Sequence, residues 1–290
     1  TTVFLFSSFT YDAFVIALLM LGIALFVTEY LSEEKIQTKR TMVSILAIVV
    51  GCFSKAVYIP FLALYWLMPK DKFYSRRQKN LFKAGIFVLL ILMFASFILP
   101  LIGNVTSGAE VGDYRGGDTS QTSQLSMILG YPLTYTGVLL KSLGTTFASY
   151  FIGSKVLANF AYRGIYDGIG YFVVLLTMLF TFVTDFGMTE KIYDAQMKRK
   201  ILMMKIWNAV LIFGTACLVW TALYLDFTPV GSMVINGVSP RYYLPLIFPL
   251  SLIFINQKVR CSMKLENYQS LIAFLMLIGT GISIYCLMLA

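Results

Sequence analysis

The sequence contains no histidine among its 290 residues, and only 13% of the residues are charged. Without histidine, the chain has no His-based general acid or base, no Ser–His or Cys–His nucleophile pair and few options for a zinc site. Soluble domains usually carry about 25% charged residues, so the scarcity of charge argues against a water-soluble fold. Any catalytic site must therefore be built from carboxylates, Lys, Arg, Tyr or hydroxyl groups.

Cysteine is also sparse. A recognisable signal peptide is absent as well. The four cysteines lie in apolar segments or in a basic loop without metal-ligand spacing, and we expect them to be packing residues with no disulfide: Cys52, Cys217, Cys261 and Cys286. The chain opens on Thr1 without a basic leader region. We expect it to be a fragment or a trimmed chain.

Apolar sequence is what the chain has in abundance: 58% of its residues are hydrophobic and the mean hydropathy is +0.78. Several runs reach the roughly 20 residues that a helix needs to cross a bilayer, and they lack the period-two alternation of a membrane β-barrel. The sequence predicts an all-α polytopic bundle with about six spans, at 11–31, 81–101, 168–187, 206–226, 241–256 and 267–289.

The segment 42–68 does not fit a simple span, because its apolar run is interrupted by Gly51, by Ser54-Lys55 and by Pro60. Such interruptions are typical of a broken helix. We predict a re-entrant hairpin of two short half-helices with Lys55 at its tip, and the alternative is a single crossing.

The basic residues predict the orientation of the bundle. Under the hairpin topology, the loops 31–41, 69–83, 188–205 and 257–265 lie on one side and hold three, six, five and three Lys and Arg residues, which is 17 of the 23. The positive-inside rule makes that side cytoplasmic. The net charge of +9 is therefore a sign of membrane orientation, and we expect no nucleic-acid partner.

The stretch 102–167 faces the other side. Its first part is polar and Gly-rich, whereas residues 125–160 are amphipathic with several tyrosines and phenylalanines. We predict helices that lie along the outer interface there, within a single membrane domain that covers residues 1–290.

Six basic residues lie outside the cytoplasmic loops: Lys55, Arg115, Lys141, Lys155, Arg163 and Arg241. A charge at membrane depth or on the wrong side needs a reason. The ammonium of Lys55 could hold a phosphate, or it could reach water or pair with a carboxylate in the bundle. The fork of Arg241 suits a phosphate or carboxylate, although Arg241 and its neighbouring tyrosines could also be interfacial anchors.

Asp12 is the candidate acidic residue, at the outer mouth of the first span. A carboxylate there could hold a sugar hydroxyl or act as a base. It could equally be a helix N-terminal charge with Thr10 as the N-cap. Asp226, Asp113 and Asp118 are weaker candidates.

Four segments together resemble a known family. They are Ser8-Phe9-Thr10-Tyr11-Asp12-Ala13, Lys55-Ala56-Val57-Tyr58-Ile59-Pro60 with Met68-Pro69-Lys70, Gln124 with Tyr131-Pro132, and Pro240-Arg241-Tyr242-Tyr243-Leu244-Pro245. In this order they resemble the bacterial polytopic membrane family of unknown function numbered 2142, which is grouped with the GT-C glycosyltransferases. The Arg-Tyr-Tyr-Leu-Pro segment is the most specific.

The resemblance implies an enzyme of the bacterial plasma membrane that moves a sugar from a polyprenyl-phosphate carrier to a cell-envelope glycan at the outer face. The catalytic acid of GT-C enzymes usually lies in the first large outer loop, often as Asp-x-Asp. This chain has no Asp-x-Asp and resembles the central and C-terminal part of such a protein, so we expect that loop to be absent from it.

The expected site combines a catalytic carboxylate with groups that bind the substrate. Asp12 is the catalytic candidate, and the expected substrate-binding residues are Lys55, Tyr58, Arg115, Arg241 and Tyr242. No metal ligand is identified, and a divalent metal requirement stays open. Two other functions also remain open, namely a transporter or flippase of a lipid-linked or anionic solute, and a non-catalytic membrane subunit.

Overall fold

The computed structural model describes residues 11–107, 117–160, 164–184, 195–254 and 261–289. The regular structure within these residues is helical, in this order: α2 Tyr11–Leu31, α3 Thr38–Cys52, η1 Ala56–Leu67, η2 Lys70–Lys72, α4 Arg76–Ser107, α5 Gln121–Gly130, α6 Pro132–Phe151, α7 Ser154–Leu157, α8 Ile169–Val183, α9 Ala195–Phe227, η5 Pro240–Tyr243, α10 Leu244–Phe254 and α11 Leu265–Leu289. The predicted all-α fold is confirmed.

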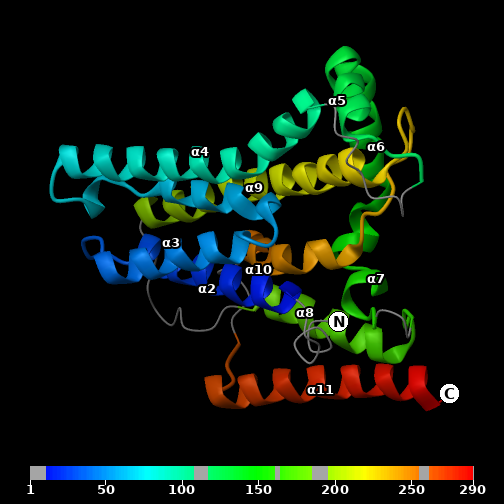
Figure 1. Cartoon of the computed structure of the whole chain (residues 1–290). Helices are drawn as coiled ribbons and strands as arrows, with labels where there is room; N and C mark the ends of the chain where they lie inside the picture. The colour runs from blue at the N-terminus through cyan, green and yellow to red at the C-terminus, as the bar shows by residue number, and fades with distance from the viewer. Residues whose placement is uncertain (1–10, 108–116, 161–163, 185–194, 255–260, 290) are drawn as a thin grey trace.

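The long helices run roughly side by side and form a bundle (Figure 1). Helix α2 packs on α3, η1 packs on α3, α4 and α9, and α10 packs on α2 and α9. Helix α11 packs on α8 at one side of the bundle. We call the end with the loops 32–37 and 68–75 the basic end, and the end covered by α5, α6 and α7 the cap end.

Four of the described helices are long and apolar enough to cross a membrane: Tyr11–Leu31, Arg76–Pro100, Ala195–Phe227 and Leu265–Met288. Each matches one of the predicted spans. The predicted spans 168–187 and 241–256 correspond to the shorter helices α8 and α10, of 15 and 11 described residues. Helices α4 and α9 extend beyond their apolar runs, because a helix can continue into polar surroundings after its membrane-embedded part ends.

The segment 42–68 folds back on itself. Helix α3 runs from the basic end to the cap end, and η1 returns, so that the backbone N–H of Ile36 donates to the carbonyl of Lys72 at 2.9 Å. This contact places the loops before and after the segment together. The predicted return of the chain to its starting side is therefore confirmed, and the single crossing is wrong. The two arms run between the ends of the bundle and are not the short half-helices that the sequence predicted.

The two arms of the hairpin have similar lengths despite different residue counts. The 15 residues of α3 rise about 22 Å at 1.5 Å per residue. The 12 residues of η1 form a 3₁₀ helix, which rises about 24 Å at 2.0 Å per residue. Pro60 lies inside η1 and has no N–H to donate, which disfavours a regular α-helix there. The stretched arm brings the chain back to the basic end in fewer residues.

Helix η1 lies in the core of the bundle, where Tyr58, Ile59, Phe61 and Tyr65 are fully buried. It is surrounded by α3, α4 and α9. A segment hydrophobic on every side is what such a central position requires.

Small residues let α2 and α3 approach closely. A methyl group at Gly22 would lie 3.0 Å from the carbonyl oxygen of Ser44 and 2.5 Å from the side chain of Ile48. The hydroxyl of Ser44 donates to the Gly22 carbonyl at 2.6 Å, and Tyr65 donates to that hydroxyl. Close backbone approach of this kind is a common means of helix association in membranes.

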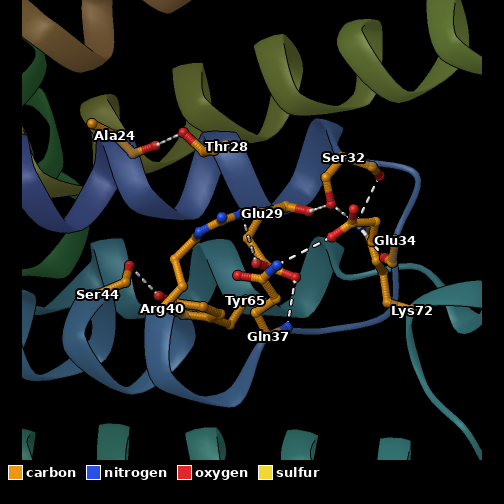
Figure 2. A network of polar contacts seen from close by, with 10 residues as sticks. All are labelled: Ala24, Thr28, Glu29, Ser32, Glu34, Gln37, Arg40, Ser44, Tyr65 and Lys72. Carbon is orange, nitrogen blue, oxygen red and sulfur yellow. Dashed lines mark hydrogen bonds and ion pairs between the residues drawn. The ribbon is translucent and has the colours of Figure 1, made fainter.

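At the basic end, the buried carboxylate of Glu29 joins α2 to the start of α3 (Figure 2). Its Oε1 accepts from the backbone N–H of Gln37 at 3.0 Å, and its Oε2 pairs with Nη1 of Arg40 at 3.4 Å. Both carboxylate oxygens are thus engaged by α3 or by the residue before it.

Lys72 closes the same end from the other arm of the hairpin. Its buried ammonium donates to the carbonyl and hydroxyl of Ser32 and to the carbonyl of Glu34 (Figure 2). Desolvation lowers the pKa of Lys72, and the charge of Glu29 opposes that shift. Three oxygen acceptors match the three N–H donors of an ammonium, so this lysine is a structural clamp.

Helices α5 and α6 cross the cap end of the bundle (Figure 1). Helix α6 packs on α9 and η5, and it is largely exposed along its remaining surface. The position of these helices along the outer membrane interface stays a prediction.

Candidate functional site

Asp12, Lys55 and Arg241 meet near the cap end, although they are far apart in sequence. The ammonium of Lys55 forms an ion pair with Oδ1 of Asp12, and Nε of Arg241 lies 3.7 Å from Oδ2. Asp12 is 4% exposed, whereas the side chain of Arg241 is 45% exposed. The three side chains form one cluster that we call the outer charge cluster.

Each member of the outer charge cluster occupies the end of an element. Asp12 lies in the first turn of α2, where a carboxylate is favoured by the helix dipole. Lys55 lies in the turn between α3 and η1, and Arg241 lies in the short helix η5 that follows Ser239. The bend in the hairpin therefore delivers Lys55 to the start of α2.

Tyrosine rings surround the ammonium of Lys55. Its Nζ lies 4.2 Å from the ring centroid of Tyr242 and 5.1 Å from that of Tyr11. The hydroxyl of the fully buried Tyr58 donates to the backbone carbonyl of Tyr242 at 2.7 Å. Cation–π contacts hold the ammonium in place, and Tyr58 fixes the segment that carries Tyr242.

The outer charge cluster contains two cations and one carboxylate. Within the described residues, the charges that act on Lys55 are those of Asp12 and Arg241. Lys55 is the buried cation and pairs directly with Asp12, whereas Arg241, the second cation on the same carboxylate, is 45% exposed. The excess positive charge therefore lies at the exposed edge of the cluster, where an anion could approach it.

A cavity of about 660 Å³ opens beside Lys55. One wall contains Tyr11, Ser54, Lys55 and Tyr242, and the opposite parts come from α4 and from the last turns of α9. The α4 and α9 walls are mostly apolar, with polar groups at Thr221 and Asp226 of α9, and Gln121 at the start of α5 adds a third polar group. A ligand in this cavity would meet the ammonium of Lys55, an apolar surface, and a polar patch that contains the carboxylate of Asp226.

An apolar groove of about 460 Å³ adjoins this cavity along α4. Phe94 and Ile98 line both hollows, and the groove continues to Phe87 and Trp66. Its lining is apolar throughout and includes no charged side chain. The two hollows together offer a cationic head region and an apolar path that follows a membrane-spanning helix.

The structure assigns different positions to the sequence-predicted site residues. Lys55 and Tyr242 line the cavity, and Asp12 and Arg241 lie in the outer charge cluster next to it. Tyr58 is fully buried in the core, and its hydroxyl donates to the backbone carbonyl of Tyr242. Tyr58 therefore holds the backbone of the site in place and does not line the cavity. Arg115, like Thr10, lies outside the described residues.

Sequence reasoning named Asp12 and Lys55 separately and did not predict their pairing, although pairing with a carboxylate was one alternative for Lys55. It also missed Gln121, which looks like an ordinary loop residue in the sequence.

All four cysteines are free, as expected. In the part of the chain that the structure describes, no three Cys, Asp or Glu side chains gather as a metal site.

A family described as "Predicted membrane protein (DUF2142)" matches residues 1–250. The chain belongs to this family. The match includes the outer charge cluster and every element from α2 to η5, while α11 lies beyond it. No curated protein and no solved structure matches the chain. The family description agrees with the helices that span a membrane, and it names no activity.

Proposed function

We propose that this chain is the membrane part of a glycosyltransferase that takes a sugar from a polyprenyl-phosphate carrier and places it on a cell-envelope glycan at the outer face of the bacterial plasma membrane. The observation that carries the proposal is the excess cation of the outer charge cluster beside the cavity. The resemblance to GT-C glycosyltransferases supplies the class of reaction.

The charge of the cluster suits the leaving group. When a sugar leaves polyprenyl phosphate, negative charge develops on the phosphate oxygen at the bond that breaks. Lys55 in the cavity wall and Arg241 next to it are placed to neutralise that charge. Fixed cations at a dry site stabilise developing charge more strongly than they would in water.

The apolar groove suits the carrier. A polyprenyl chain cannot enter water, and a lipid-linked phosphate must therefore be held at membrane depth with its tail in an apolar path. The groove from Phe94 to Trp66 begins at the cavity and follows α4. The sugar would then occupy the cavity, with the ring of Tyr242 as one of its walls.

The test is sugar transfer by the full-length protein in lipid vesicles, with a labelled polyprenyl-phosphate sugar as donor and a cell-envelope glycan as acceptor. We expect label in the glycan, and a loss of about 100-fold in rate for Lys55→Ala, as found when one group that stabilises a developing anion is removed. Arg241→Ala should lose less, because its side chain is partly exposed. Lys141→Ala removes an exposed charge from α6 and is the matched control.

Wild-type rates in Lys55→Ala and Arg241→Ala would remove these residues from the phosphate site. Label that crosses the vesicle membrane without reaching the glycan would favour a transporter or flippase. A vesicle assay that follows both the glycan and the lumen separates the two functions in one experiment.

A further inference from the structure

The carboxylate that the sequence favours for catalysis is enclosed by cations. Oδ1 of Asp12 pairs with Lys55 and Oδ2 faces Arg241. The side chain is almost fully buried, and Asp12 does not belong to the lining of the cavity. A hydroxyl group in the cavity would have to displace a cation to reach it.

Asp226 differs from Asp12 in its exposure and in its place in the lining of the cavity. It is an exposed residue in the last turn of α9, and it lines the same cavity as Lys55. The negative end of the helix dipole lies at this terminus, so an aspartate here is placed against the dipole and the helix does not gain stability from it.

Gln121 gives Asp226 a polar neighbourhood. The Nε2 of Gln121 donates to Oδ1 of Asp226, and both residues line the cavity. The Oε1 of Gln121 is buried and has no hydrogen-bond partner among the described residues. A buried acceptor without a donor is costly, and a carboxamide oxygen next to a carboxylate calls for hydroxyl donors.

We infer that Asp226 is the catalytic base that accepts the proton of the attacking acceptor hydroxyl, and that Gln121 orients that hydroxyl or its sugar. The inference rests on the proposed function and assigns to Asp226 the role that the sequence suggested for Asp12. Asp12 then acts as a positioning residue, since it holds Lys55 and Arg241 at the leaving phosphate.

The step balances without a further reactant. The acceptor oxygen forms a bond to the anomeric carbon of the donor sugar, and the bond between that carbon and the phosphate oxygen breaks. The electron pair of that bond leaves with the phosphate near Lys55, and the proton of the acceptor hydroxyl passes to Asp226. The products are the extended glycan and polyprenyl phosphate.

The experiment compares Asp226→Asn, Asp226→Glu and Asp12→Asn in the vesicle assay, with donor binding measured separately. Asp167→Asn removes an exposed aspartate that does not line the cavity and is the control. We expect Asp226→Asn to lower kcat by about 100-fold or more, as is usual for the loss of a general base, with donor affinity almost unchanged. Asp226→Glu should recover part of the rate.

The pH dependence gives a second readout. The wild-type rate should fall as the pH falls below the range in which the base is ionised, and Asp226→Asn should lose this acidic limb. Asp12→Asn should keep the limb and change donor binding and protein stability. A structural role of Asp226 would not produce this pattern.

The outcomes separate the inference from the function on which it rests. Asp226→Asn protein with a wild-type kcat and an intact acidic limb would overturn the inference and leave the glycosyltransferase in place. A wild-type protein that neither binds nor uses the donor would overturn the proposed function, and the role of Asp226 with it.

Discussion

Helix α2 carries a buried carboxylate near each end, and the two ends differ in how their charges are balanced. Glu29 at the basic end is held by a backbone N–H and one arginine, and the nearby Lys72 is held by three oxygens. Asp12 at the cap end faces two cations, and one of them lines a cavity. Both ends are similarly buried, so burial alone does not identify a site.

A buried charge whose hydrogen-bond and ion-pair partners all come from the chain is structural. A buried charge that also faces a cavity is a candidate for binding a ligand. Around Glu29 and Lys72, the chain itself supplies the partners and ties the base of the hairpin. Around Lys55, the partners are two aromatic faces and a carboxylate shared with Arg241, and the ammonium lies in the wall of a cavity.

Replacing the two lysines should give the largest contrast. Lys55→Met should reduce sugar transfer by about 100-fold, because a cation at the leaving phosphate is lost. Lys72→Met should leave three oxygens without their donor and reduce the free energy of unfolding by about 1–3 kcal/mol, with transfer per folded molecule unchanged. Vesicle assays normalised to folded protein measure both. A reversed pattern would contradict the distinction between the two ends.

Removing the two carboxylates should destabilise the protein at both ends, with different responses to ligand. Asp12→Ala leaves Lys55 without its carboxylate, which costs about 3–5 kcal/mol for a buried pair. Glu29→Ala should cost about 1–3 kcal/mol, because the backbone N–H of Gln37 loses its acceptor.

In Asp12→Ala, the phosphate of polyprenyl phosphate should replace the missing carboxylate as the partner of Lys55. In Glu29→Ala, no such replacement is expected, because Glu29 lies at the basic end. In thermal unfolding followed by tryptophan fluorescence, we expect a larger ligand-induced rise in Tm for Asp12→Ala than for the wild type. Glu29→Ala should show the wild-type rise. Equal rises in both variants would argue against an anion site at Lys55.

Glycine substitutions test the close contact between α2 and α3, which connects the two ends that are compared. Gly22→Ala should lower the free energy of unfolding by about 1–3 kcal/mol, since the added methyl group overfills the contact with Ser44 and Ile48. Gly85→Ala on α4 is the control, because no atom lies within 4 Å of the added methyl group. The control should be neutral or stabilising by about 0.5–1 kcal/mol. Thermal unfolding of the two variants in the same detergent measures the difference.

The two arginines should show the smallest effects on stability. Arg40 and Arg241 reach their carboxylates at 3.4 Å and 3.7 Å, and their side chains are 31% and 45% exposed. Partly exposed pairs contribute about 1 kcal/mol or less, so Arg40→Gln and Arg241→Gln should each unfold near the wild-type temperature. Only Arg241→Gln should raise the KM for the donor, by about tenfold, the equivalent of 1.4 kcal/mol.

The sequence alone predicted the membrane bundle, because hydropathy and helix length are local properties and the apolar runs record them directly. It also predicted the fold-back of residues 42–68, because the basic loops on both sides of that segment had to lie together. It did not predict the long 3₁₀ helix, since the register of η1 depends on its neighbours α3, α4 and α9.

Sequence also named the unusual charges without pairing them. Lys55 and Arg241 stood out because they break the charge bias of the loops, and Asp12 stood out as an acid at a helix start. Only the tertiary structure decided that the three meet, that Asp12 is shared between two cations, and that Asp226 and Gln121 line the cavity beside Lys55. Polarity and span length are local properties that can be read from consecutive residues. The balance of charge at a site depends instead on which distant segments the packing of helices brings together.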